Sequence, residues 1–232
     1  MTPQAVVVPF AGPPAGASAG FPGCAMDCAL RHETDHRVAN HLAMLSSYIR
    51  LKSAEFEQPG PLGRDAARLF AQSLDAQIRA VARLHRVLTS QDRDAEVDLA
   101  TLLREVCAPF ANALDQRVVI IQDFSPDCCA RPDQILQISQ LVGEAITNAV
   151  KHAYPGDATG VLLIRSQPTG AGGVLIEVND NGAGLPEAFD PDRDGGFGLH
   201  LMRGLSRGLR APLSFFSSPQ GLRVSLTLRA GG

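Results

Sequence analysis

The first part of the chain holds two long stretches with helical periodicity, separated by the breaker QPGPLG at 58–63. The first stretch runs from about residue 23 to residue 57, and its apolar residues recur at the 4, 3, 4 spacing of a heptad seam. These residues are Val38, Leu42, Leu45 and Ile49. Such a seam favours a helix that pairs along its length with another helix.

The second stretch, from residue 64 to about residue 89, also carries one apolar stripe. Its members are Ala67, Phe70, Leu74, Ile78, Val81 and Leu88. Two such helices joined by a short loop predict an αα-hairpin. Because each helix has a stripe to bury, we expect the pair to meet a second copy and complete a four-helix bundle as a homodimer. A monomeric hairpin that packs on the following domain is the alternative.

The remaining pattern mixes helices with strands. Helical periodicity covers 96–114, with Asp98 as the predicted N-cap, and returns at 199–209. Runs rich in β-branched residues predict strands, and turn-forming residues join them into two hairpins. The strands are expected at 117–124, 161–167, 174–180, 213–218 and 222–230. Helices grouped with a mostly antiparallel sheet predict an α+β fold, in which the helical hairpin precedes an α/β sandwich.

Composition narrows the function classes. The net charge of −3 carries no basic footprint for nucleic acid. No apolar run approaches the ~20 residues needed to span a membrane. An odd number of cysteines, five, without metal-site spacing favours reduced thiols and a cytoplasmic location. The expected domains are a disordered Ala/Gly/Pro-rich arm (1–24), the helical hairpin (25–93) and the sandwich domain (94–232).

The stretch LVGEAITNAVKHAY at 141–154 predicts a helix with one unusually functional face. At ~100° per residue, Glu144, Asn148, Lys151 and His152 fall opposite its apolar residues. This combination suits a site for a phosphate and a divalent cation, although a solvated polar face is the simpler interpretation.

Two glycine clusters follow this helix. Asp180, Gly182 and Gly184 stand at the end of a strand, where glycine lets the backbone turn and approach a ligand closely. Gly196 and Gly198 lead into a helix, whose exposed amides favour a phosphate. Neither cluster matches the P-loop or the dinucleotide-binding fingerprint, so the predicted nucleotide site is of another kind.

Taken in order, these motifs resemble a known family. The second half of the chain resembles the ATP-binding domain shared by histidine kinases, gyrase, Hsp90 and MutL. The resemblance rests on E-x-x-x-N-x-x-K-H-A, followed by D-x-G-x-G and then by a glycine-rich lid. Upstream, ETDHRVANHL is similar to the E-x-x-H-R-x-x-N-x-L box of histidine kinases with the type-2 dimerisation and phosphoacceptor domain. The box matches at Glu33, His36, Arg37, Asn40 and Leu42.

The resemblance implies a role for each matching residue. His36 would be the phosphorylated residue. Asn148 would ligate Mg²⁺, and Glu144 would hold or polarise its water. Lys151 and His152 would contact the phosphates of ATP. Asp180 would bind the adenine amine, while the pocket and lid would be shaped by Gly182, Gly184, Gly196 and Gly198. Tyr154 would flank the base.

The helical geometry is consistent with a reactive His36. Its side chain points away from the seam, with Glu33 and Asn40 on its own face at i−3 and i+4. An imidazole with an ordinary pKa of about 6.5 is mostly neutral in the cytosol and is already a nucleophile. We therefore place His36, Glu33, Asn40 and Glu144 in the catalytic group. Glu33 could orient the imidazole, or it could be a simple helix pair.

Three functions remain open. The leading hypothesis is an ATP- and Mg²⁺-dependent protein-histidine kinase, which passes the phosphoryl group from His36 to an aspartate of a response regulator receiver domain. A phosphotransfer or phosphatase hub with little ATP turnover is the second, because Asp194 and Leu222 depart from the family pattern. A receiver-binding scaffold is the third. With no sensor domain expected before the hairpin, either the signal would come from a separate sensor protein or the chain would be a kinase core regulated in another way.

Overall fold

The computed structural model describes residue 39, residues 42–43, 45–50 and 53, and the ranges 64–89, 96–111, 117–155, 158–170, 172–190 and 193–229. The predicted reactive residues of the first helix, Glu33, His36 and Asn40, lie outside these residues. So do the arm at 1–24 and the breaker at 58–63.

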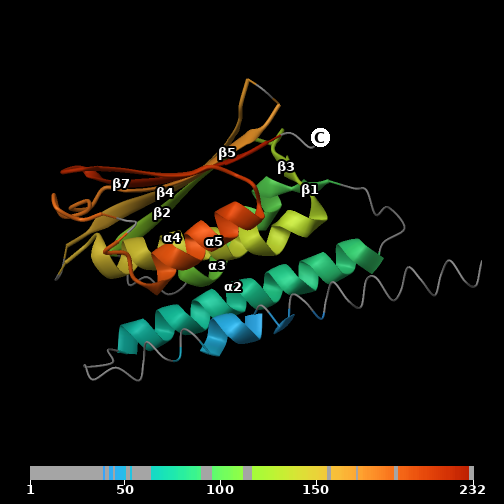
Figure 1. Ribbon diagram of the computed structural model, residues 1–232, viewed down its shortest axis with the longest axis horizontal. Helices are drawn as coiled ribbons and strands as arrows, with labels where there is room; N and C mark the ends of the chain where they lie inside the picture. Colours follow the sequence, from blue (N-terminus) through green and yellow to red (C-terminus); the bar gives the residue numbers. More distant parts are fainter. Residues whose placement is uncertain are drawn as a thin grey trace, which may run out of the picture.

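A five-stranded sheet forms one layer of the molecule (Figure 1). Its order is β2 (Val118–Phe124), β4 (Gly160–Pro168), β5 (Val174–Asp180), β7 (Gly221–Leu228) and β6 (Leu213–Ser218). β2 and β4 pair in parallel, and every other neighbouring pair is antiparallel. The mostly antiparallel sheet and both hairpins predicted from the sequence are confirmed.

Three helices cover one face of this sheet: α3 (Leu99–Ala111), α4 (Ile135–His152) and α5 (Phe197–Gly208) (Figure 1). The sheet alternates along its strands, so that Leu162, Ile164 and Ile176 face the helices and are buried. Phe110 and Ile146 meet them from the helical side of the same core. This sandwich confirms the predicted α+β class.

The ends of the elements follow local signals. Asp98 caps α3 as predicted, since its carboxylate accepts hydrogen bonds from the backbone amides of Ala100 and Thr101 at 3.1 and 3.0 Å. A short 3-10 turn, η1 (Pro132–Gln134), leads into α4. The sequence did not predict the two-residue strands β1 (Val97–Asp98) and β3 (Cys129–Ala130), which are too short to show periodicity.

A further helix, α2 (Arg64–Thr89), runs alongside the sandwich helices on the side away from the sheet (Figure 1). It packs along α3 and α4. The buried side of α2 is formed by Leu69, Ser73, Ala76, Gln77, Ala80 and Leu84. Of the apolar stripe predicted for this helix, Ile78 remains 56% exposed. The contact with α3 and α4 therefore uses a face that lies beside the apolar stripe and includes polar residues.

The first helix of the hairpin is described only in part, at Ala39, 42–43, 45–50 and Ser53. Leu45 and Tyr48 are buried, whereas Leu42 of the predicted seam is 51% exposed. In the described part of the chain, no helix is long and apolar enough to cross a membrane. The three described cysteines, Cys107, Cys128 and Cys129, are free thiols, as expected.

Candidate nucleotide-binding site

A cavity of about 650 Å³ opens between α4, α5 and the neighbouring edge of the sheet. Most of the residues predicted to bind a nucleotide line it: Asn148, Lys151, His152, Asp180, Gly184, Gly196 and Gly198. They come from α4, from the end of β5 and from the start of α5, three segments well separated in sequence. The tertiary fold therefore brings the three predicted motifs to one concave site.

Asp180, at the end of β5, is held by backbone amides. Its Oδ1 accepts hydrogen bonds from the amides of Gly182 and Leu222 at 3.0 and 3.1 Å. No residue in the described part of the chain donates to Oδ2. A carboxylate fixed through one oxygen can present the other to an amino group of a ligand, as an adenine-binding residue has to do.

The two glycines after Asp180 allow backbone conformations and close packing that a side chain would hinder. Gly184 has φ of 70°, in the left-handed region that glycine adopts without strain. Gly182 does not line the cavity; a side chain there would collide with the backbone carbonyl of Ala153, just beyond α4. Gly182 thus permits close packing between the turn and the end of the helix.

Leu222 occupies the position where the family pattern has threonine. Its backbone amide supports Asp180, and its side chain lines the cavity. The departure therefore leaves the support of Asp180 intact and makes the wall more apolar. Tyr154 lies beneath the site instead of lining it, since its ring packs against Gly160 and its hydroxyl donates to the carbonyl of Val161 at 2.8 Å. Burial, followed by the nearby Asp180 carboxylate, raises the pKa of Tyr154 to about 12.

The two predicted metal-site residues of α4 meet at the start of α5. A Cβ placed on Gly198 would lie 2.8 Å from Glu144 Oε2 and 3.2 Å from Asn148 Oδ1. Glycine at this position therefore keeps space beside two oxygen donors, which suit a hydrated Mg²⁺ ion. Among the described residues no cluster of three or more His, Cys, Asp or Glu could hold a metal.

Glu144 differs from its expected position. The helical projection placed it on the polar face with Lys151 and His152, and those two residues are exposed. Glu144 is instead fully buried and does not line the cavity. The physical reason is that the hairpin covers this side of α4, where Tyr48 donates a hydrogen bond of 2.6 Å to Glu144 Oε1.

Polar residues that the sequence analysis missed complete this buried contact. Tyr48 also shares a hydrogen bond of 2.7 Å with Ser73, and Gln77 on α2 accepts one from Gln140 on α4 at 3.3 Å. Hydrophobic periodicity could not identify these residues, because it scores serine and glutamine as solvent-facing. The sequence signal that could have indicated a buried polar contact was the placement of serine and glutamine at 73 and 77, one helical turn apart.

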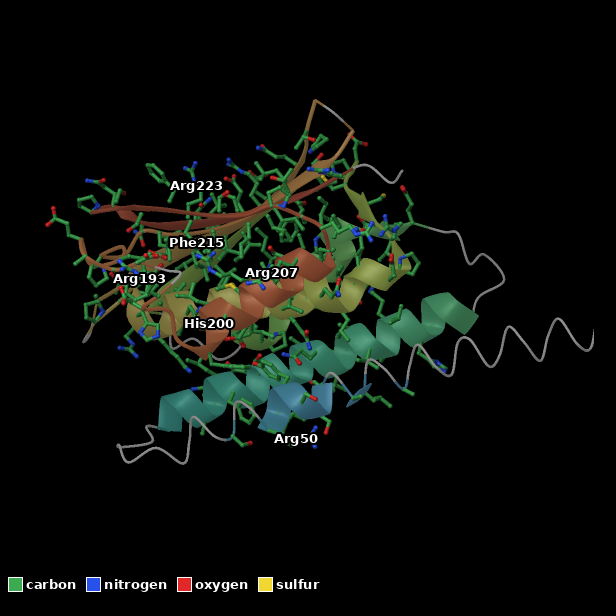
Figure 2. All side chains as sticks on the ribbon, viewed as in Figure 1. Arg50, Arg193, His200, Arg207, Phe215 and Arg223 are labelled. Carbon is green, nitrogen blue, oxygen red and sulfur yellow. The ribbon has the colours of Figure 1, made fainter. Side chains whose placement is uncertain are left out.

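The loop before α5 is closed by its own hydrogen bonds. The amide of Asp190 donates to Asp194 Oδ2 at 2.8 Å, and Arg193 pairs with Asp190 at 2.9 Å. Asp194, which replaces a lid glycine, thus stabilises the loop while lining the cavity. Figure 2 shows Phe215 on the sheet and His200 on α5 at this end of the molecule. Phe215 also lines the cavity.

Comparison with known proteins shows to which family this chain belongs. The model of the family "Histidine kinase-like ATPase domain" matches residues 72–228, more than half of the chain. The chain belongs to this family. The match begins within α2, so it includes most of the helix that packs against α3 and α4.

Two relatives in this comparison are named as histidine kinases. The chain is 30% identical over 201 residues to Blue-light-activated histidine kinase 2 of Erythrobacter litoralis, covering 84% of this chain and 56% of the relative. It is 27% identical over 176 residues to sensor histidine kinase PdtaS of Mycobacterium tuberculosis, covering 75% of this chain and 33% of the relative. The chain thus spans between about a third and just over half of the length of these relatives.

One solved structure resembles nearly the whole chain. It is the histidine kinase domain from the Erythrobacter litoralis EL346 blue-light activated histidine kinase, with a TM-score of 0.64 and 26% identity. The likeness covers 90% of this chain and 94% of that domain. The helices and the sheet of this chain are therefore arranged much as in that histidine kinase domain.

Proposed function

We propose that this chain is an ATP-dependent protein-histidine kinase that phosphorylates itself on His36. The phosphoryl group then passes to an aspartate on the receiver domain of a response regulator. The observation that carries the proposal is the single cavity that joins Asn148 and Lys151 on α4 with Asp180 and the glycines before α5. The match of the upstream sequence to a histidine-kinase phosphoacceptor box supports His36 as the acceptor.

The residues of the cavity divide the work of holding ATP. Asp180 accepts a hydrogen bond from the adenine amine, and apolar residues such as Met202 and Val224 contact the ring. The side chains of Lys151 and His152, at the end of α4, provide positive charge and hydrogen-bond donors for the phosphates. The amides at the start of α5 add the favourable electrostatics of a helix N-terminus.

Glu144 and Asn148 supply the oxygen donors for Mg²⁺. When bound, the ion neutralises charge on the phosphates and so favours a loose phosphoryl-transfer transition state. In the proposed reaction a nitrogen of His36 forms a bond to the γ-phosphorus while the bond from that phosphorus to the β–γ bridging oxygen breaks. ADP leaves, and the histidine carries the phosphoryl group.

The decisive experiment is an autophosphorylation assay with γ-labelled ATP and Mg²⁺. We expect acid-labile, base-stable label on the wild-type protein and none on His36→Ala or Asn148→Ala. Label that survives in His36→Ala would refute the assignment of the acceptor. Transfer is tested by adding candidate receiver domains to the labelled kinase and following the label onto an aspartate.

A phosphotransfer hub is the second candidate, because Leu222 makes the adenine side of the cavity more apolar than the family pattern. A hub would show no label from ATP, while His36 would still accept phosphate from a phosphorylated receiver. For the kinase we propose a homodimer formed through the hairpin and a cytoplasmic location.

A further inference from the structure

The hydroxyl of Tyr48 joins the hairpin to the candidate metal site. Tyr48 is 3% exposed and donates to Glu144 Oε1 at 2.6 Å, across 96 positions of sequence. Ser73 of α2 lies 2.7 Å from the same hydroxyl and is 2% exposed. This contact is buried on both sides, so it is not a chance meeting of surface side chains.

The two oxygens of the Glu144 carboxylate lie next to different parts of the protein. Oε1 receives the hydrogen bond from Tyr48, and Oε2 lies beneath Gly198, at the start of α5 and beside the amide group of Asn148. The two oxygens of one rigid carboxylate cannot turn independently. The direction of Oε2 toward the candidate metal site therefore depends on what holds Oε1.

A buried carboxylate requires hydrogen-bond donors, because its charge is costly to remove from water. A tyrosine hydroxyl is suited to this task, and burial, followed by the Glu144 charge, raises the pKa of Tyr48 above its ordinary value. Tyr48 is the donor in its hydrogen bond to Glu144 Oε1. A short hydrogen bond to a charged acceptor is among the stronger contacts of its kind.

We propose that Tyr48 is a positioning residue, which orients the Glu144 carboxylate for the Mg²⁺–ATP site only while the hairpin is packed against α4. Tyr48 lies on the same predicted helix as His36. The helix that carries the phosphoryl acceptor thus also completes the site that holds the phosphoryl donor. This inference rests on the proposed nucleotide function of the cavity and adds to it a residue from outside the cavity.

The test compares four variants with the wild-type chain: Tyr48→Phe, Ser73→Ala, Glu144→Gln and the double variant Tyr48→Phe/Glu144→Gln. Phenylalanine keeps the ring packing and removes only the donor. Ser73→Ala is the matched control, since it removes the other partner of the hydroxyl and leaves the bond to Glu144. Thermal unfolding of each variant first establishes that it folds.

Two readouts follow: the rate and ATP KM of autophosphorylation, and calorimetric binding of a non-hydrolysable ATP analogue with Mg²⁺ or with a chelator. Removal of a residue that orients a metal ligand typically costs ~10-fold or more in affinity or activity. We expect Tyr48→Phe to lose about that factor in rate and in Mg²⁺-dependent binding. KM for ATP, which is measured with Mg²⁺, should rise along with the loss of binding. Binding in the chelator should stay near the wild-type value, and Ser73→Ala should match the wild type throughout.

The double variant separates positioning from packing. If Tyr48 acts through Glu144, Tyr48→Phe has little further effect once Glu144 is glutamine. The same loss in both backgrounds, or wild-type behaviour of Tyr48→Phe, would overturn the inference while leaving the kinase proposal intact. A wild-type chain that takes no label would refute the kinase proposal, and the Mg²⁺-dependent binding cycle would then decide the role of Tyr48. Failure to bind the analogue at all would overturn both.

Discussion

At the scale of single residues, the site depends on oxygens that backbone and side-chain donors hold in place. Asp180 is fixed through Oδ1 by two amides, and Glu144 through Oε1 by a tyrosine. Asp180 lines the cavity, whereas the second oxygen of Glu144 lies beneath Gly198, which lines it. Preorganised polar groups of this kind avoid the cost of reorientation when the ligand binds.

Asp180→Asn tests the first of these carboxylates. The asparagine can keep its oxygen on the amides of Gly182 and Leu222 and so retain the turn. Its amino group would then face the adenine amine, donor against donor. We expect ATP affinity to fall about 100-fold, or ~2.7 kcal/mol, measured by calorimetry. Asp123→Asn, an exposed change on β2, is the control. Unchanged affinity in Asp180→Asn would contradict the assignment.

Gly198→Ala tests the space beside the metal-site oxygens. The new methyl group would lie 2.8 Å from Glu144 Oε2, within α5 and against a buried carboxylate. We expect Mg²⁺-dependent ATP binding to weaken by about tenfold. Gly204→Ala in the same helix meets no atom within 4 Å, and it should keep wild-type binding and gain up to ~1 kcal/mol of stability. Equal binding by the two variants would show that this space is not needed.

At the scale of elements, α2 is attached to the sandwich by polar as well as apolar contacts. Arg83 on α2 forms a two-pronged pair with Glu105 on α3, with distances of 2.8 and 2.7 Å. Two parallel hydrogen bonds define both the distance and the rotation of the helices. A single hydrogen bond of 3.3 Å, from Gln140 to Gln77, joins α2 to α4.

Arg83→Met is expected to destabilise the fold by about 1–2 kcal/mol, because it leaves a half-buried carboxylate without its donor. Arg79→Met is the control on the same helix. Arg79 pairs with Asp75 in solvent, so its loss should leave the unfolding free energy almost unchanged. Urea unfolding followed by circular dichroism measures both, and equal losses would contradict a specific role for the Arg83 pair.

The same ion pair predicts a pH dependence. Hydrogen bonding by Arg83 lowers the pKa of Glu105 in the folded protein. A carboxyl group with a lowered folded pKa contributes stability above its ordinary pKa and loses it as the pH falls through the folded value. The difference in unfolding free energy between wild type and Arg83→Met should therefore shrink below about pH 4. A difference that is constant from pH 7 to pH 3 would exclude this linkage.

At the scale of the whole molecule, three layers meet: the sheet, the helices α3 to α5, and α2 with the described part of the first helix (Figure 1). The cavity lies between the first two layers, and Tyr48 reaches α4 from the third. Occupation of the cavity should therefore stabilise the assembly of all three layers.

Ligand binding supplies the whole-molecule prediction. A ligand present at 100 times its dissociation constant stabilises the folded state by about 2.7 kcal/mol, which raises Tm by roughly 5–10 °C in a chain of this size. We expect such a shift with ATP and Mg²⁺ and a smaller one after chelation of the metal. In Asp180→Asn the same ligand concentration is about equal to the dissociation constant, so the shift should be only about 1 °C. Differential scanning fluorimetry measures it. The same shift with and without chelator would argue against a metal ion in the site.

The sequence by itself determined the main helices and strands and predicted the candidate site. Helical and strand periodicity located the sheet and its hairpins, and the motifs predicted the candidate site residues of α4, β5 and α5, most of which line one cavity. These signals are local, because each depends on residues within a few positions of one another. The residues around His36 remain a prediction, since they lie outside the described part of the chain.

Only the tertiary structure decided which face of α2 is buried and where Glu144 points. Burial of Ser73 and Gln77 is favourable only because Tyr48 and Gln140 meet them, and Tyr48 reaches Glu144 from 96 positions away. A buried polar residue depends on a partner that sequence periodicity cannot name. The side chains of an amphipathic pattern indicate what prefers to leave water, whereas the fold determines which polar groups find donors once they have left it.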